Sequence, residues 1–312
     1  MYWGKVTADY DWCERNYVVT PYIAEFWNCI SSVGVLLAGI YFLRRSLRFS
    51  YGRRFHFASV GVAIIGLGSI LFHGTLQRWG QVLDEVPMLW SSLIFLWIAC
   101  VNNMDGCAEN RWGTILGWSL FVLGIVSTYI YLLGGFAYFI VVYIITVIGV
   151  FGATLYQLRK DSPARRYAFM AVGYYSGGFL FLWLPEQLLC GNRKVSFHES
   201  GLLSLPIPLH AFFHLTSSIG PVCCLTYLTF EYLEQRKRNP SLMYERAAEF
   251  LGTLDMPLVK ASPVWYHEGQ TFTDAMQLLS QNFLIYGRKN YNNKNKIMAL
   301  LFTFVVKTII TL

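Results

Sequence analysis

Residues 55–76 read FHFASVGVAIIGLGSILFHGTL, a run of 22 residues without Asp, Glu, Lys or Arg. An α-helix needs about 20 apolar residues to cross the roughly 30 Å hydrocarbon core of a bilayer. The run therefore predicts a membrane-spanning helix. His73 lies near its end, at a depth where an ionisable side chain is costly and marks a candidate functional site.

Six further stretches are also long and predominantly apolar, so the chain is predicted to be an all-α membrane protein with a bundle of seven transmembrane helices. These stretches are 25–43, 83–103, 113–133, 136–157, 166–184 and 205–233. The composition agrees, because 55% of the residues are hydrophobic and only 14% are charged, against about 25% charged in soluble domains. We expect a short N-terminal segment (1–24), a transmembrane catalytic domain (25–233) and a weakly ordered tail (234–312).

The basic residues between the spans predict the orientation. Thirteen Lys and Arg fall on the side of the loops 44–54, 102–112 and 158–166 and of the stretch after the seventh span, against five on the other side. Cytosolic loops carry the excess of Lys and Arg, so the N-terminus is expected in the lumen or outside the cell and the C-terminus in the cytosol. The net charge of +7 is thereby explained by topology, and no nucleic-acid partner is expected.

Two further features follow from this map. Cys13 and Cys190 are the two cysteines placed in lumenal segments, where disulfides persist, so we expect them to pair.

The tail ends in an apolar stretch, 297–312, that contains Lys307 and is short for a span. A cytosolic tail is the expected state of this region, with an eighth span or a surface-bound helix as alternatives.

A zinc site is predicted where three spans meet. The seventh span carries His210-Ala-Phe-Phe-His214, and two histidines four residues apart on a helix face one way and can bind one zinc ion. The predicted topology places His73 at the same depth, at the lumenal end of the second span. Three protein ligands leave a fourth position for water, which is the catalytic arrangement, and zinc lowers the pKa of that water to about 7.

Two more polar residues fall at this depth. Asp84 begins the third span and can accept the proton of the water and pass it to a leaving amine, although a cap on the helix start is an alternative. Ser69 lies one turn before His73 and can donate a hydrogen bond to an oxyanion, although a bond to its own helix is equally open. Together these residues predict hydrolysis of an amide bond in a lipid.

An acidic segment precedes the first span. Oxygen-bearing side chains at Asp11, Glu14, Asn16 and Glu25, with the backbone carbonyl of Trp12, suit a hard cation such as calcium. The spacing is not that of an EF-hand, so a solvated acidic loop is the alternative.

The sequence resembles the alkaline ceramidase family over roughly residues 9–238. The motifs that carry the resemblance are Asp11-Trp-Cys-Glu-Arg-Asn-Tyr-Val-Val-Thr20, Tyr22-Ile-Ala-Glu-Phe-Trp-Asn28, Gly68-Ser69, Phe72-His73, Thr75-Leu76, Leu83-Asp-Glu-Val-Pro-Met88 and His210-Ala-Phe-Phe-His214. The tail after about residue 240 departs from the family's pattern, so no function is carried onto it.

The resemblance implies a seven-helix enzyme of the endoplasmic reticulum or Golgi that hydrolyses ceramide to a sphingoid base and a free fatty acid. It implies zinc on His73, His210 and His214, catalytic roles for Asp84 and Ser69, and a lumenal disulfide between Cys13 and Cys190. It also implies calcium on Asp11, Trp12, Glu14, Asn16 and Glu25.

Two alternative functions stay open. One is an amidase specific for phytoceramide or dihydroceramide, because generic apolar residues lining a lipid pocket do not reveal the preferred chain. The other is a receptor similar to the adiponectin receptors, with residual hydrolase activity. Those receptors have a cytosolic N-terminus, and the distribution of Lys and Arg in this chain disfavours that orientation.

Overall fold

The computed structural model describes residues 2–9, 11–102, 104, 106–158, 161–190, 208–236, 241–246 and 255–260. The chain divides into two units, Met1–Ser262 and Pro263–Leu312. The second unit, with the apolar stretch 297–312, lies outside the described residues.

The described residues form seven helices that are long and apolar enough to cross a membrane, as the sequence predicts. The first five are α1 (Phe26–Arg48), α2 (Arg53–Thr75), α3 (Arg78–Val101), α4 (Gly106–Leu132) and α5 (Phe136–Tyr156). The sixth crossing comprises α6 (Arg165–Gly178), the π-helical segment η1 (Phe179–Trp183) and α7 (Leu184–Cys190), and the seventh is α8 (Leu209–Gln235). The assignment of the two ends to lumen and cytosol stays a prediction.

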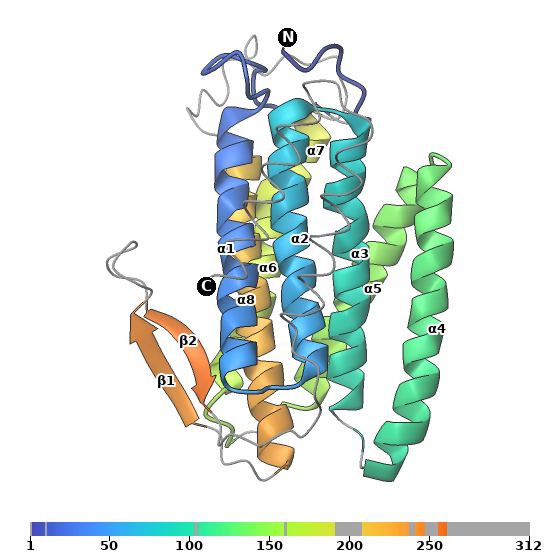
Figure 1. Cartoon of the computed structure of the whole chain (residues 1–312), viewed down its shortest axis with the longest axis vertical. Coiled ribbons are helices and arrows are strands. Elements are labelled where there is room, and N and C mark those ends of the chain that lie inside the picture. Colours follow the sequence, from blue (N-terminus) through green and yellow to red (C-terminus); the bar gives the residue numbers. More distant parts are fainter. Residues whose placement is uncertain are drawn as a thin grey trace, which may run out of the picture. The chain divides into compact units, whose positions relative to one another are not determined.

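Close backbone contacts hold the centre of the bundle together. The helices α1, α2 and α3 stand side by side, α8 packs against α1 and α6, and α4 lies at the outer edge (Figure 1). A Cβ atom on Gly66 would lie 2.2 Å from the backbone nitrogen of Leu36, and one on Gly39 would lie 2.3 Å from that of Ala63. Lipid gives no hydrophobic drive for helix association, so such small residues matter because they allow tight packing.

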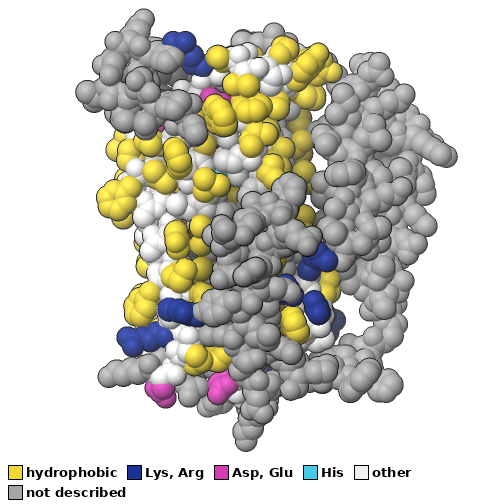
Figure 2. Space-filling view, turned by 90° about the vertical axis from the view of Figure 1, so that its left-hand side faces the viewer, with side chains coloured by type: hydrophobic (Ala, Val, Ile, Leu, Met, Phe, Trp, Pro, Cys, Tyr) yellow, Lys and Arg dark blue, Asp and Glu magenta, His cyan; other side chains and the backbone are white. Residues whose placement is uncertain are grey.

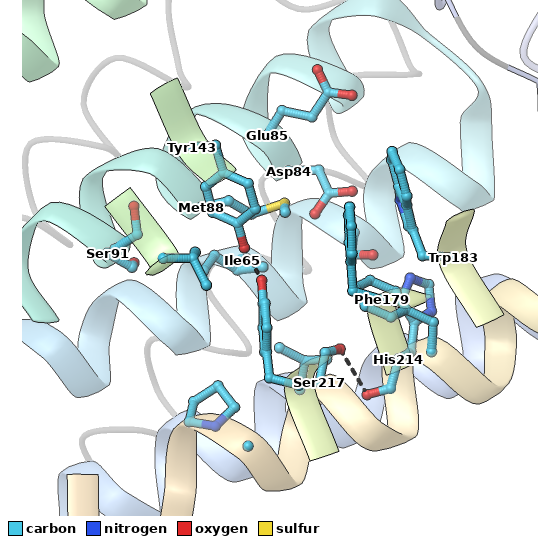
Figure 3. Close-up of a pocket in the computed structure, with 18 of the residues that line it drawn as sticks. Ile65, Asp84, Glu85, Met88, Ser91, Tyr143, Phe179, Trp183, His214 and Ser217 are labelled. Atoms are coloured by element: carbon cyan, nitrogen blue, oxygen red, sulfur yellow. Dashed lines mark hydrogen bonds between the residues drawn. The ribbon is translucent and has the colours of Figure 1, made fainter. Parts of the chain in front are cut away.

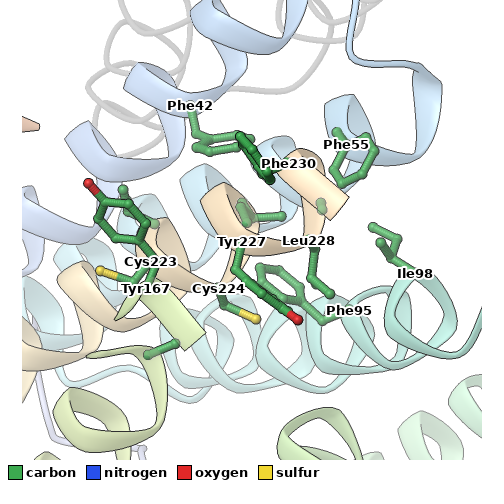
Figure 4. Close-up of a cluster of buried hydrophobic side chains, with 14 of the residues drawn as sticks. Phe42, Phe55, Phe95, Ile98, Tyr167, Cys223, Cys224, Tyr227, Leu228 and Phe230 are labelled. Carbon is green, nitrogen blue, oxygen red and sulfur yellow. The ribbon is translucent and has the colours of Figure 1, made fainter. Parts of the chain in front are cut away.

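The largest cluster of buried apolar side chains joins α1, α2, α3, α6 and α8. Its members include Phe42, Phe55, Phe95, Tyr167, Tyr227, Leu228 and Phe230 (Figure 4). The lipid-facing surface is also apolar, as Figure 2 shows for one face, where several Lys and Arg side chains gather toward the lower end. A rigid interior and an apolar exterior are what a membrane-embedded scaffold requires.

Several helix boundaries differ from the predicted spans by four residues or more. Helix α8 begins later than predicted, at Leu209 rather than 205. The other helices are longer than predicted: α3 begins at Arg78 rather than 83, α4 begins at Gly106 rather than 113, α1 continues to Arg48 rather than 43, and the sixth crossing runs through η1 and α7 to Cys190 rather than 184. The predicted bounds follow apolar residues, whereas the helices also include polar residues at their ends. Arg78, for example, donates to Asp9 at 2.6 Å and to the hydroxyl of Tyr131 at 3.0 Å.

A two-stranded antiparallel sheet follows the last helix. Strand β1 (Ser241–Arg246) pairs with β2 (Asp255–Lys260), with Ser241 opposite Lys260 and Arg246 opposite Asp255. The all-helical prediction applies to the membrane-spanning part, and this hairpin within the expected weakly ordered tail was not anticipated. Its strands are short and lack the alternating apolar pattern that would signal them in the sequence.

Candidate active site

Three histidines from two helices meet inside the bundle. His73 lies at the end of α2, and His210 and His214 lie in the first two turns of α8. Each offers one ring nitrogen such that all three nitrogens lie within 4.8 Å of one another. The three side chains are buried. The predicted convergence of His73 with the pair on α8 is therefore present in the structure.

Hydrogen bonds orient two of these rings. The Nδ1 atom of His73 lies 2.5 Å from the Oε2 atom of Glu25, and the Nδ1 atom of His214 lies 3.1 Å from the backbone oxygen of Asn28. A carbonyl oxygen can only accept, so the Nδ1–H of His214 donates and its Nε2 keeps the lone pair. A histidine that ligates a metal typically donates its other N–H in this way.

Two ring nitrogens are left unsatisfied. The Nε2 atom of His73 and the Nδ1 atom of His210 are buried and have no hydrogen-bond partner among the described residues. Unpaired buried polar atoms are rare and require an explanation such as an ion. Three clustered imidazoles, two of them oriented by hydrogen bonds and two with an unpaired buried nitrogen, fit a zinc ion with three protein ligands.

Asp84 and Ser69 come together beside the histidines. Asp84 is buried in the second turn of α3, six residues after its start, so it is not a cap on that helix. The hydroxyl of Ser69 lies 2.9 Å from that of Ser32, and Ser69 and Asp84 line the same pocket. Gly68 makes this proximity possible, because a Cβ atom there would lie 2.0 Å from the backbone oxygen of Leu83.

Ser69, Asp84, His210 and His214 line a pocket of about 160 Å³. Figure 3 shows Asp84 from α3 and His214 from α8 at this pocket, with Trp183 of η1 beside them. A π-helical turn often marks a functional site. The remaining lining is largely apolar and includes Val62, Ile65, Phe95, Val147, Val150, Phe151 and Cys224. The arrangement can hold a molecule with a polar reacting group and long hydrocarbon chains.

The predicted calcium ligands also lie close to one another. The Nδ2 atom of Asn16 donates to both carboxylate oxygens of Asp11 at 3.0 Å, and the backbone N–H of Trp12 donates to Glu25 at 2.8 Å. Glu14 accepts from the backbone N–H groups of residues 27 and 28, at the start of α1. The Oδ1 atom of Asn16 is buried with no partner among the described residues, and such an oxygen fits a hard cation.

The electrostatics of this acidic cluster favour a cation. Burial raises the pKa of Glu14, although hydrogen bonds from the start of α1 act in the opposite direction. Burial raises the pKa of Glu25 to about 8, and the neighbouring Asp11 contributes to the rise. Crowded, poorly solvated carboxylates resist ionisation, and a bound cation would favour their charged forms.

The acidic cluster and the histidine cluster share contacts. Glu25 accepts from Trp12 through one oxygen and contacts His73 through the other. The ring of Trp12 stacks on that of His210, with centroids 3.6 Å apart. The sequence motifs did not reveal this connection, because it depends on how the N-terminal segment folds over the ends of α2 and α8.

The structure also identifies supporting residues that the sequence reasoning missed. Asn28 and Ser32 of α1 contact His214, and Glu186 of α7 accepts from the backbone N–H of His210. Backbone partners leave no motif in the sequence. Glu186 was missed because it follows the predicted span 166–184, although an acidic residue directly after an apolar run is a signal that could have identified it.

The cysteines are described only in part. Among the described residues, Cys29, Cys100, Cys223 and Cys224 are free. The side chain of Cys190 lies outside the described part, so its pairing with Cys13 stays a prediction.

Comparison with known proteins finds one family and several similar proteins, all of them ceramidases. Residues 4–258 match the family described as ceramidase. The chain is 30% identical to an alkaline ceramidase of Arabidopsis thaliana over 261 residues, covering 83% of this chain and 94% of that protein. It is 30% identical to alkaline ceramidase 3 of Mus musculus, covering 78% and 95%. It is 25% identical to an alkaline ceramidase of Drosophila melanogaster, covering 77% and 83%.

Proposed function

The chain belongs to the alkaline ceramidase family, and from this membership we propose that it hydrolyses ceramide with a zinc ion bound by His73, His210 and His214. It is a membrane-embedded hydrolase that acts on the amide bond of ceramide and yields a sphingoid base and a fatty acid. The zinc ion, the roles of individual residues and the calcium ion belong to the proposal.

The observation that carries the proposal is the set of buried ring nitrogens. His73 Nε2 and His210 Nδ1 have no described partner, and the bond from His214 Nδ1 to a carbonyl leaves its Nε2 available. Zinc bound there would supply a water of lowered pKa and polarise the amide carbonyl. His73, His210 and His214 would hold this zinc ion next to the pocket, which His210 and His214 line.

Asp84 is the proposed general base and acid. It lies on the pocket beside His210 and His214, where its carboxylate can accept a proton from the attacking water. The same proton then passes to the amide nitrogen as the carbon–nitrogen bond breaks, so the sphingoid base leaves as an amine. Ser69 donates a hydrogen bond to the carbonyl oxygen as negative charge develops there.

The acidic cluster is proposed to bind calcium through Asp11, Glu14, Asn16, Glu25 and the carbonyl of Trp12. Its support is the buried, unpaired Oδ1 atom of Asn16 and the concentration of carboxylates. Because Glu25 contacts His73, the cation has a structural or regulatory role at the active site. The proposal also includes a lumenal disulfide between Cys13 and Cys190, and residence in the endoplasmic reticulum or Golgi membrane.

The decisive experiment measures the release of labelled fatty acid from ceramide by the purified protein in detergent, together with its zinc content. His73→Ala is expected to lose at least roughly 100-fold in activity, as removal of an essential catalytic group does, and to lose bound zinc. His56→Ala is the matched control, since His56 contacts Ser46 near the other end of α2, and it should retain both. Full activity of His73→Ala, or full activity after zinc removal, would refute the zinc mechanism.

A further inference from the structure

Glu186 is a buried carboxylic acid with no part in the mechanism above. Glu186 is 2% exposed, and it lies in α7, directly after the π-helical segment η1. An acidic side chain is costly at such a position unless hydrogen bonds compensate for the lost hydration. The partners of Glu186 therefore indicate its role.

Both described partners of Glu186 are backbone N–H groups of functional segments. One oxygen accepts from Cys13 at 3.3 Å, within the segment that carries the acidic cluster. The other accepts from His210 in the first turn of α8. The residue before α8, Pro208, provides no side-chain cap, so Glu186 supplies from another helix the acceptor that the first turn lacks.

The position of His210 is thereby fixed from two sides. Its backbone donates to Glu186, and its ring stacks on Trp12, with centroids 3.6 Å apart. Trp12 in turn contacts the edge of Trp183, with centroids 6.1 Å apart, three residues before Glu186. A closed set of contacts thus joins the N-terminal segment, the end of the sixth crossing and the start of α8.

We propose that Glu186 is a positioning residue for His210, which holds the start of α8 so that the imidazole stays aligned with His73 and His214. The inference rests on the proposed zinc site. It assigns to α7 a role in metal retention, because movement of α7 would release the His210 backbone and the Cys13 backbone together. A carboxylate at this helix start is also favoured by the helix dipole.

The test compares Glu186→Gln and Glu186→Ala with a matched control, Glu231→Gln. Glu231 is a buried acid (1% exposed) near the end of α8 opposite to His210, where it contacts Ser162. Zinc affinity is measured by competition with a chromogenic chelator, and kcat and KM are measured at low and saturating zinc. The thermal unfolding midpoint of each variant shows whether it is folded.

Glu186→Gln keeps the shape of the side chain but retains only one acceptor oxygen, so zinc affinity is expected to fall about 10–100-fold, as for other residues that orient a ligand. Saturating zinc should restore much of kcat while KM stays near the parent value, and Glu231→Gln should bind zinc like the parent. If Glu186→Ala does not fold, Glu186→Gln alone decides the result.

Parent-like zinc affinity in folded Glu186→Gln would overturn the inference even if the zinc mechanism holds. An equal loss in Glu231→Gln would overturn it as well, because the effect would then be one of general stability. A parent protein that binds no zinc would instead refute the proposed function, so the two failures are distinguishable.

Discussion

Replacing Glu25 by Gln should weaken zinc binding without removing any predicted zinc ligand. Glu25 accepts from the backbone of Trp12 at 2.8 Å and from the side-chain amide of Asn28 at 3.1 Å, and its Oε2 atom lies 2.5 Å from Nδ1 of His73. Gln has one acceptor oxygen. Whichever way its amide turns, an NH₂ group faces at least one N–H donor in the protein interior.

The expected losses of stability and of zinc affinity follow from the one hydrogen bond and the carboxylate that the substitution removes. In the calcium-bound protein the cation keeps Glu25 ionised, and a hydrogen bond to a charged group contributes about 1.5–3 kcal/mol. The loss of one bond should therefore lower the free energy of unfolding of the calcium-bound protein by about 2 kcal/mol. Loss of the carboxylate behind His73 makes the ring a weaker ligand, and residues in this position typically change metal affinity about 10–100-fold. That range corresponds to about 1.4–2.7 kcal/mol of binding free energy.

The assay is chelator competition for zinc, combined with ceramide hydrolysis at low and saturating zinc. Glu14→Gln is the matched control, because Glu14 accepts from backbone N–H groups at the start of α1 and has no described contact with a histidine. Both variants should alter the response to calcium, but only Glu25→Gln should lose zinc affinity. Parent-like zinc affinity in Glu25→Gln would refute the argument that Glu25 couples the two clusters.

The remaining predictions concern the catalytic groups and the helix contact that positions them. Asp84→Asn should lower kcat by about 100- to 10,000-fold with zinc content unchanged, because an amide cannot carry the proton. Ser69→Ala should lower kcat by about 100-fold or more with little change in KM, if its hydroxyl stabilises the oxyanion. Gly68→Ala should destabilise the protein by about 1–3 kcal/mol and reduce activity, because its Cβ would collide with the backbone of Leu83. Gly152→Ala, with open space at its Cβ, should be neutral or slightly stabilising.

Single-turnover hydrolysis, zinc content and thermal unfolding check these three predictions. Near-parent turnover in Asp84→Asn would exclude Asp84 as the proton carrier. A change in KM alone for Ser69→Ala would indicate substrate binding rather than oxyanion stabilisation. Equal unfolding midpoints for the two glycine variants would contradict the packing argument at Gly68.

The sequence by itself determined the membrane class, the seven spans and the candidate zinc ligands. These features can be predicted from the sequence because each side chain has its own free energy of transfer into lipid, and these free energies add up along one helix. The spacing of His210 and His214 is likewise set by one helical turn. The depth of His73 followed from the alternating direction of the spans, which needs no knowledge of packing.

Only the tertiary structure decided how these groups are supported. The extension of α3 back to Arg78 places Asp84 inside the bundle rather than at a helix start. Glu25 joins the acidic cluster to His73, and Glu186 holds the backbone of His210. Such contacts depend on the rotation of each helix and on the path of the N-terminal segment. Several of them use backbone N–H groups, which nearly every residue carries and no sequence pattern marks.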